Sequence, residues 1–327
     1  MTQSQRRTPN YRRRFGWFGA FIALLFGGYS AGWFYLGDML ETKAADALRA
    51  FNSNGREVEC VNAEAHGFPF RMGLWCDSLK FADARQGLAV TAASFRSAAQ
   101  VYNPFHIVAE LDSPARLDLP AVGEIDAGWD NLRASVRADY DFPERVSLEM
   151  NGLKAKLLGA DAALDLQAGE LHMRRNGADL DLAASMTGAS PQGAMLRAAA
   201  VPPIDGAIDV TIKDGVKLAT RGGGSLRGVS GTLRTLTISS GTDASVSVTG
   251  PFAVNDQGLL NAELMLSVRN PQAIGAILQR VFPAASEQIA AATMGVAAMG
   301  PDARIPLIVK DGRAQLGFIP IGPVPAM

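Results

Sequence analysis

Residues 66–76, HGFPFRMGLWC, combine a histidine, an arginine, three aromatic residues and a cysteine, a density of versatile side chains unmatched elsewhere in the chain. The chain has two cysteines, Cys60 and Cys76. With His66 they could suggest zinc, but a structural zinc site needs four ligands at spacings that are absent here. The pair would form a disulfide in an oxidising compartment and stay as free thiols in a reducing one. The chemistry of this segment therefore depends on where it is located.

Other candidates for catalysis are weak. His106 and His172 are isolated from each other and from any nucleophile, and His106, at the start of an apolar strand, is better explained as a hydrogen-bonded structural residue. The glycine-rich segment 221–228 lacks the Gly-Lys-Ser/Thr ending of a phosphate-binding loop. Residues 228–231 do not form the Gly-x-Ser-x-Gly elbow of hydrolases. The sequence therefore predicts no catalytic residue, no metal, no cofactor and a protein that is not an enzyme.

The N-terminus predicts a membrane anchor. Residues 1–14 form a basic tail with five arginines, and residues 15–37 form an uncharged run long enough to cross a bilayer. Aromatic residues near both ends and arginines before the run favour a span with its N-terminus in the cytoplasm. A cleaved signal peptide and a buried core helix are the alternatives. The anchor residues are Trp17, Phe18, Ile22, Leu24, Leu25, Phe26 and Trp33.

The rest of the chain is then exported. Residues 38–55 have apolar positions at helical spacing and predict a stalk that ends at a cap near Asn54 and Gly55, and residues 56–327 form the exported domain. The formal charge of the whole chain is −1 and five arginines precede Phe15, which leaves −6 for the remainder. A mildly acidic body argues against nucleic acid as a partner.

Export to an oxidising compartment favours a disulfide between Cys60 and Cys76. Closing a loop of about 15 residues stabilises a fold by roughly 3 kcal/mol on the chain-entropy model. Inside the loop, Gly67 and Pro69 indicate a turn, and every second residue is apolar. The sequence predicts a stapled strand-turn-strand unit with an aromatic plug rather than a catalytic centre. The alternating residues are Phe68, Phe70, Met72 and Leu74.

This segment and a second one, at residues 99–120, resemble the domain of unknown function 2125, a family of uncharacterised Gram-negative envelope proteins. The resemblance implies one N-terminal span and a location in the bacterial inner membrane, single-pass, with the main domain in the periplasm. It implies no activity. The residues that carry it are His66, Gly67, Phe68, Pro69, Phe70, Arg71, Val101, Tyr102 and Pro104.

Alternation of apolar and polar residues dominates the exported domain and predicts antiparallel strands buried on one face. Aspartate recurs between apolar residues at positions 118, 165, 181 and 209, although strands disfavour it. We therefore expect the other face to stay in water. Hairpin turns are predicted at residues 150–154, 174–179 and 213–217. The apolar face is predicted to hold Leu132, Val136, Leu148, Leu164, Leu166, Leu180 and Leu182.

Helices are predicted near residues 271–299. Asn270 and Pro271 have the types expected of an N-cap and a first-turn proline, Pro283 ends the first helix, and a second begins at Ser286. The chain then returns to strand, with a hairpin that turns at Asp311 and Gly312. The sequence thus predicts a mainly β protein, a long antiparallel meander with an N-terminal transmembrane helix and a C-terminal helix pair.

Two functions fit this architecture. A large one-sided sheet has to cover its apolar face. If the sheet curls into an open trough, the protein binds or shelters lipid or another apolar envelope component without catalysis, in a β-groove that resembles those of AsmA-like envelope proteins. If the sheet closes as a sandwich, the protein is a structural or protein-interaction module of the cell envelope. The inner membrane is the one partner that the sequence predicts directly, and lipid is the candidate ligand.

Overall fold

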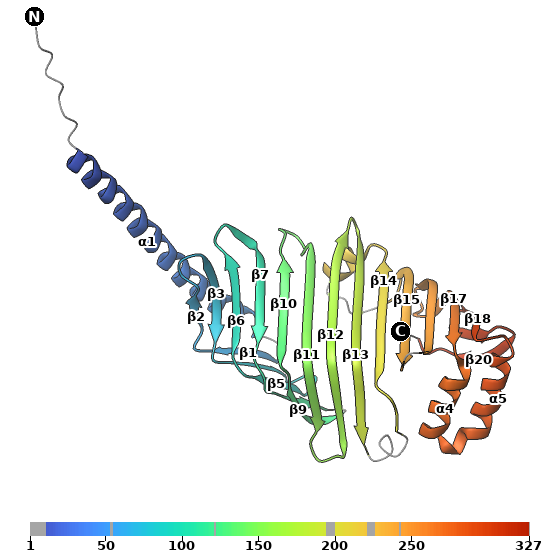
Figure 1. The fold of residues 1–327 in the computed structure, drawn as a ribbon. Coiled ribbons are helices and arrows are strands. Elements are labelled where there is room, and N and C mark those ends of the chain that lie inside the picture. The colour runs from blue at the N-terminus through green and yellow to red at the C-terminus, as the bar shows by residue number, and fades with distance from the viewer. Residues whose placement is uncertain are drawn as a thin grey trace, which may run out of the picture.

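The computed structural model describes residues 11–52, 55–120, 122–193, 200–220, 226–241 and 243–326 (Figure 1). Parts of three sequence predictions lie outside these ranges. They are the basic tail up to residue 10, the helix cap at Asn54, and residues 221–225 of the glycine-rich segment.

Helix α1 runs without interruption from Tyr11 to Phe51, through both the predicted span and the predicted stalk. It is long and apolar enough to cross a membrane, with a mean hydropathy of 1.3 in its most apolar window, of which 6% is buried. At 1.5 Å per residue, 41 residues extend for about 60 Å, roughly twice the thickness of a bilayer core. The helix therefore reaches well beyond any membrane it spans, and it extends away from the β2–β3 end of the sheet (Figure 1).

The first half of the sheet consists of two series of strands. In the first series, β1, β4, β5, β8 and β9 pair in that order, and in the second β2, β3, β6, β7 and β10 do so. The chain passes repeatedly from one series to the other. The bounds of the first series are Arg56–Val61, Ser78–Asp83, Leu88–Ala92, Ala115–Leu119 and Gly123–Gly128, and those of the second are Glu64–His66, Arg71–Cys76, Phe95–Gln100, Asn103–Leu111 and Asn131–Arg137.

Strand β11, Arg145–Leu157, joins the two series. Its first part pairs with β10 and its last four residues pair with β9. The change falls at Gly152, whose φ is +65°. Residues 150–154 were predicted to form a hairpin turn, and this prediction was wrong. Glycine adopts a positive φ at no steric cost, and a side chain at this position would collide with the carboxylate of Asp130. Gly152 therefore lets β11 pass from one partner strand to the other without reversing its direction.

From β11 onward each strand pairs with the next one in sequence. Among the described residues, twenty strands form one antiparallel sheet, which confirms the predicted long antiparallel sheet, but only the part from β11 onward is a meander. The sheet is not closed, since among the described residues β1, β2 and β20 each pair on one side only. The remaining strands are β12 Ala162–Asn176, β13 Asp179–Gly193, β14 Ile204–Ile212, β15 Ser230–Ser240, β16 Ala244–Val254, β17 Leu260–Arg269, β18 Asp302–Lys310, β19 Arg313–Leu316 and β20 Ile319–Pro323.

Two of the remaining predicted hairpin turns are present in the structure, and one is not. Residues 174–179 contain the predicted turn between β12 and β13, with Gly177 at a φ of +64°. Asp311 and Gly312, at φ of +45° and +71°, turn the predicted hairpin between β18 and β19. Residues 213–217 do not make a hairpin, because the chain enters a short helix, α3, at Gly215–Thr220. The sequence did not predict α3, which is too short for an amphipathic pattern to appear.

The C-terminal helix pair is confirmed. Helix α4 is Pro271–Val281 and α5 is Ser286–Ala297, with a 3₁₀ turn at Pro283–Ala285 between them. Asn270 is the N-cap of α4, and its side-chain oxygen accepts a hydrogen bond from the backbone N–H of Ala273 at 3.2 Å. Figure 1 shows both helices at the C-terminal end of the sheet.

Few side chains are deeply buried. The buried apolar residues are mostly small, such as Ala92, Ala115 and Ala303, and no large side chain among the described residues is less than 2% exposed. This is expected for a sheet that is one layer thick over much of its length. Large apolar side chains on such a sheet stay accessible unless something else covers them.

Candidate functional site

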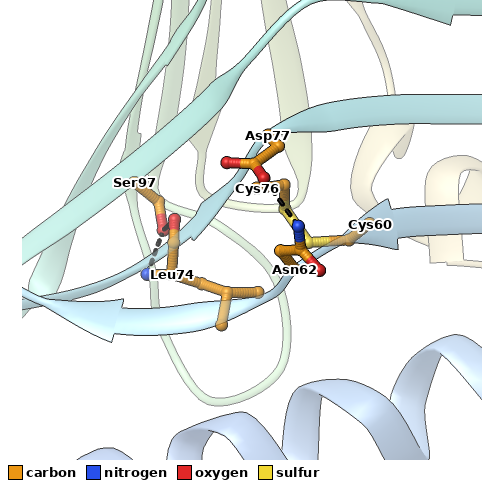
Figure 2. The surroundings of a disulfide bond; sticks show 6 residues. All are labelled: Cys60, Asn62, Leu74, Cys76, Asp77 and Ser97. Atoms are coloured by element: carbon orange, nitrogen blue, oxygen red, sulfur yellow. Dashed lines mark hydrogen bonds between the residues drawn. A yellow bond between two sulfur atoms is a disulfide. The ribbon is translucent and has the colours of Figure 1, made fainter.

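The two cysteines are joined as a disulfide between the end of β1 and the end of β3. The Cα atoms of Cys60 and Cys76 are 5.3 Å apart, and the described residues contain no free cysteine. Beside the disulfide, the Asn62 side chain donates to the Asp77 carboxylate at 2.7 Å (Figure 2). The segment is therefore a structural staple, and no group of His, Cys, Asp and Glu among the described residues could hold a metal.

The predicted strand-turn-strand unit is present, but its strand is shorter than predicted. Strands β2 and β3 pair with Ala65 opposite Leu74, whereas residues 67–70 form the turn, closed by the Arg71 N–H donating to the Gly67 carbonyl at 2.9 Å. The prediction that Phe68 and Phe70 continue the alternation of β3 was wrong. Gly67 has a φ of +113° and Pro69 has no N–H to donate, so neither residue can extend the ladder.

The turn packs against α1. The Phe68 ring stacks on Phe34, with centroids 5.6 Å apart, and meets the edges of Trp33 and Phe26 at 5.5 and 6.4 Å. Trp33 Nε1 donates to the Arg71 carbonyl at 2.9 Å, and the Tyr29 hydroxyl donates to the Pro69 carbonyl. The aromatic plug therefore fixes one end of the sheet to the helix.

The contacts of His66, at the start of the motif, are those of a structural residue. Its ring stacks on the Trp75 ring with centroids 4.4 Å apart, and Nε2 lies 3.4 Å from the Glu64 carboxylate. His106 is hydrogen-bonded to the Ser135 hydroxyl at 3.0 Å. Both histidines contact neighbouring strands, which agrees with a structural role.

An apolar cavity lies where α1 meets the sheet. Its volume is about 330 Å³, within the lower range of ligand pockets. Leu36 and Leu40 of α1 line one side, and Met72, Val101 and Ile107 from β3, the β6–β7 turn and β7 are among the residues that line the other. The motif residue Pro104 lies in the same wall.

Three rows of apolar residues run across the sheet. Each row consists of residues that lie directly opposite one another in neighbouring strands, and such residues share one side of a sheet. The first row crosses ten strands from β7 to β18: Ala109, Ala134, Leu148, Leu171, Ala184, Ile208, Leu236, Val248, Leu266 and Ile305.

The other two rows flank the first at alternate positions of the same strands. One is Ile107, Val136, Val146, Met173, Leu182, Val210 and Leu233. The other is Leu132, Met150, Gly169, Met186, Gly206, Ile238, Val246, Val268 and Ala303. Together the three sets are called the apolar rows below.

Among the described residues, helices α1 and α4 lie over the two ends of the apolar rows, and the start of α3 lies against Leu180 of β13. The α1 cavity lies at the β7 end, and at the other end Ile274, Ile277 and Leu278 of α4 face Ile238 and Val246 across a cavity of about 180 Å³. Side chains between these ends are open, among them Leu171 at 47% exposure. The exposed large members of the rows are Ile107, Leu148, Leu171, Met186, Ile208 and Ile238, of which Ile107 and Ile238 lie at the ends near α1 and α4.

Five of the seven leucines and valines predicted to share one face have registers that fit the apolar rows: Leu132, Val136, Leu148, Leu180 and Leu182. Leu164 and Leu166 lie beyond an interruption in the β12–β13 pairing, between Asp165 and Ala168. Leu166 Cδ2 nevertheless lies 3.3 Å from where a Cβ of Gly169 would be. It therefore reaches the side of the sheet to which Gly169 belongs.

Charged side chains gather at positions that alternate with the apolar rows. Asp181 in β13 accepts hydrogen bonds from Arg174 at 2.8 Å, Thr211 at 2.8 Å and Arg234 at 3.4 Å, and Arg234 also contacts Asp209. Asp181 is only 6% exposed, so the expectation that the mid-strand aspartates are solvated fails at this position. Two arginines and a threonine on three neighbouring strands replace water around its carboxylate.

This environment controls the pKa of Asp181. Burial acts to raise the pKa, but hydrogen bonds from Arg174 and Thr211 and the positive charges of Arg234 and Arg174 outweigh burial and hold the pKa below its usual value. A carboxyl group whose folded pKa is depressed contributes stability above its unfolded pKa and loses it as the pH falls through the folded pKa.

We therefore expect Asp181→Asn to lower the free energy of unfolding by about 1 kcal/mol at neutral pH, because the arginines remain partly exposed and solvent screens their charges. The difference should shrink as the pH falls below about 4, where the aspartate of the unfolded chain is protonated. Urea unfolding of both proteins between pH 7 and 3 measures this. A difference that stays constant across the range would contradict a role for the charge.

We also expect the disulfide to stabilise the folded protein. Replacing both cysteines, Cys60→Ser with Cys76→Ser, frees a loop of 16 residues in the unfolded state and should lower the free energy of unfolding by about 3 kcal/mol. Urea unfolding in the presence and absence of reductant measures it. Reductant should destabilise the wild type by a similar amount and leave the variant unchanged. Reagents that label both thiols of the unreduced wild-type protein would show that no disulfide is present.

Comparison with known proteins gives a family but no activity. The model of the family described as "Uncharacterized protein conserved in bacteria (DUF2125)" matches residues 33–325, almost the whole chain. Searches of curated proteins and of solved structures found no match.

Proposed function

The chain belongs to the DUF2125 family, and we propose that it is a non-enzymatic protein that α1 anchors in the bacterial inner membrane and that holds lipid acyl chains against the apolar rows in the periplasm. The observation that carries this proposal is the continuity of the apolar rows between the membrane helix and α4. A ligand that covers them has to be long, flexible and apolar. Acyl chains have these properties.

The size of the apolar surface supports a ligand. With strands about 4.8 Å apart and same-side residues about 6.8 Å apart, rows that cross ten, seven and nine strands enclose roughly 450 Å². Soluble monomers rarely expose contiguous apolar patches this large unless the patch binds something. The length, about 43 Å, exceeds that of any one side chain or helix turn that could cover it.

Interruptions in the strand pairing support a curled sheet. Register shifts occur between Met186 and Ala189 in β13, between Asp209 and Val210 in β14, and between Leu233 and Leu236 in β15. Such irregularities bend strands and increase their twist. We propose that these bends, with the separation of the two strand series at Gly152, curl the sheet into a trough whose inner side holds the apolar rows.

The membrane helix supports the location. Arg12, Arg13 and Arg14 lie in the first turn of α1 and precede its uncharged run, as expected of the cytoplasmic end of a span. The sheet follows the other end of the helix and would then lie in the periplasm, where the disulfide is stable. In this arrangement the α1 cavity lies at the membrane end of the apolar rows, so a lipid could pass from bilayer to sheet without crossing open water.

Site-specific photo-crosslinking tests the proposal. A photoreactive phenylalanine analogue at Leu171, in the full chain in phospholipid vesicles, should form lipid adducts detectable by mass spectrometry. The matched control is His172, the next residue in β12, which belongs to the opposite side of the strand and is also accessible, with 43% of its side chain exposed. Lipid adducts at Leu171 but not at His172 would support the proposal. Protein adducts alone at Leu171 would favour the structural or interaction module instead.

A further inference from the structure

The turn at residues 67–70 lies beside a part of α1 that belongs to the membrane. Phe68 contacts Phe26, and Pro69 accepts a hydrogen bond from Tyr29. Both helix residues fall within the uncharged run at residues 15–37. The packing therefore brings a part of the β domain alongside the predicted span, and not merely alongside the stalk.

The helix rise gives the depth of the contact. Gly37 ends the uncharged run, and Tyr29 and Phe26 precede it by eight and eleven residues. At 1.5 Å per residue these positions lie about 12 and 16 Å inside that end of the run, measured along the helix. A span that uses residues 15–37 to cross a core of about 30 Å then places Phe68 below the lipid headgroups.

Neighbouring turns extend the same exposed apolar edge. The backbone N–H of Val101 donates to the Phe70 carbonyl at 3.0 Å, which holds the β6–β7 turn against the β2–β3 turn. Phe70 is 69% exposed and Tyr102 is 76% exposed. Farther along, the Phe105 and Tyr140 rings are in contact, with centroids 5.8 Å apart. Aromatic side chains at hairpin ends suit the interface between water and acyl chains.

We propose that the turn at residues 67–70, together with Val101 and Tyr102, inserts into the outer leaflet of the membrane that α1 spans. The occupant of this surface is the phospholipid leaflet. None of these residues carries a charge, so apolar area drives the insertion and salt has little effect on it. The proposal rests on the membrane span that belongs to the proposed function, but it does not require lipid on the apolar rows.

Insertion has a consequence for the α1 cavity. Val101 belongs both to the inserted edge and to the cavity wall that it shares with Leu36 and Met72. The cavity then opens beside the acyl chains of the leaflet. The family motif of the turn acquires a function in this way, because its Gly, Pro and aromatic residues shape a membrane-inserted edge at the start of the apolar rows.

Spin labels at single cysteines test insertion in the full chain, with the native disulfide intact. Phe70→Cys and Tyr102→Cys carry the label at the proposed edge, and Phe21→Cys reports on the span itself. Phe318→Cys, fully exposed between β19 and β20 at the other end of the sheet, is the matched aromatic control in water. Collisions with oxygen, which concentrates in lipid, and with a water-soluble nickel complex are measured in vesicles of phosphatidylethanolamine and phosphatidylglycerol.

The labels at Phe70, Tyr102 and Phe21 should respond to oxygen and lose their response to nickel, while the label at Phe318 responds to nickel. Nickel access at Phe70 and Tyr102 equal to that at Phe318, with Phe21 protected, would overturn insertion and leave the anchor intact. Nickel access at Phe21 as well would overturn the span and insertion together. Protection at Phe70 that disappears when protein is diluted in lipid would assign the edge to a second copy of the chain and also overturn the proposal. Tyr102, in an exposed turn, keeps the test valid if Phe70→Cys folds poorly.

Discussion

Leu171→Asp should remove most of the lipid that cross-links to the apolar rows, while the protein stays folded. Leu171 occupies the middle of the first row, with Leu148 on one side and Ala184 on the other. A carboxylate among acyl chains is poorly solvated, and it either displaces them or has to take up a proton. Because Leu171 is 47% exposed, the substitution should lower the free energy of unfolding by only about 1 kcal/mol.

The measurement uses a photoreactive group at Ile208, two strands from the substitution in the same row. Lipid adducts at Ile208 should fall strongly in Leu171→Asp. The matched control is Ser147→Asp, which adds the same charge at a position of β11 that alternates with the apolar rows and lines a polar hollow with Arg145 and Arg174. Adducts in the control should equal those of the wild type. Equal adducts in both variants would contradict lipid binding along the rows, and unfolding of Leu171→Asp alone would indicate a closed core.

The strands could be predicted because alternation is a local property. Each strand in the stretch from Leu132 to Ala184 shows it within a few residues of sequence, and the observed strands follow it. The prediction of a hairpin turn at residues 150–154 failed because that segment depends on neighbours in space. Asn151 and Gly152 have the sequence of a tight turn, yet Gly152 lies inside β11, because β9 and β10 supply partners for both parts of the strand.

The apolar rows could not be predicted without the register between strands, which the sequence of a single strand does not specify. Alternation suggests that Leu171 and Leu148 are on apolar faces, but only pairing shows that they lie opposite one another and that Ala184 and Ile208 continue the row. Alternation also places Leu166 and Leu171 on opposite sides of one strand, since five residues separate them. The interruption between β12 and β13 changes that relation, because Leu166 reaches the side of Gly169, and no residue pattern indicates this in advance.

The turn that forms the candidate membrane edge was also predicted only in part, because its packing depends on residues far apart in the sequence. The cysteine count and the predicted export were enough to predict the disulfide correctly. The contact between Phe68 and Phe26 joins residues 42 positions apart, and nothing in their spacing predicts it. The sequence feature that could have indicated the membrane edge was its composition. Phe68 and Phe70 flank a proline in a turn, and exposed aromatic side chains in a turn have no core to enter.

Gly73→Ala should have the largest effect on stability of any single substitution proposed for this chain. Gly73 lies in β3, within the stapled unit. A Cβ at this position would be 1.7 Å from the Ser97 carbonyl oxygen and 2.7 Å from the Ala98 Cα. These are backbone atoms of the paired strand β6, so no side-chain rotation relieves the overlap. We expect a loss of about 4 kcal/mol, at the upper end for single substitutions.

Strands β3 and β6 approach closely at Gly73 because a side-chain hydroxyl links them. The Ser97 hydroxyl accepts from the Leu74 N–H at 2.9 Å and donates to the Leu74 carbonyl at 3.1 Å, in place of direct backbone bonds (Figure 2). An alanine would separate the strands and break this pair of hydrogen bonds. It would also move β3 away from the wall of the α1 cavity, which includes Gly73 and Ser97.

The matched control is Gly128→Ala in β9. Gly128 also lies in a strand with a negative φ, and a Cβ there would meet nothing within 4 Å. This change should alter the free energy of unfolding by at most about 0.5 kcal/mol. Urea unfolding of both variants in the same detergent, followed by tryptophan fluorescence, compares them directly. If Gly73→Ala unfolds at the same urea concentration as Gly128→Ala, strands β3 and β6 do not approach as closely as described. The α1 cavity beside them would then have a different shape.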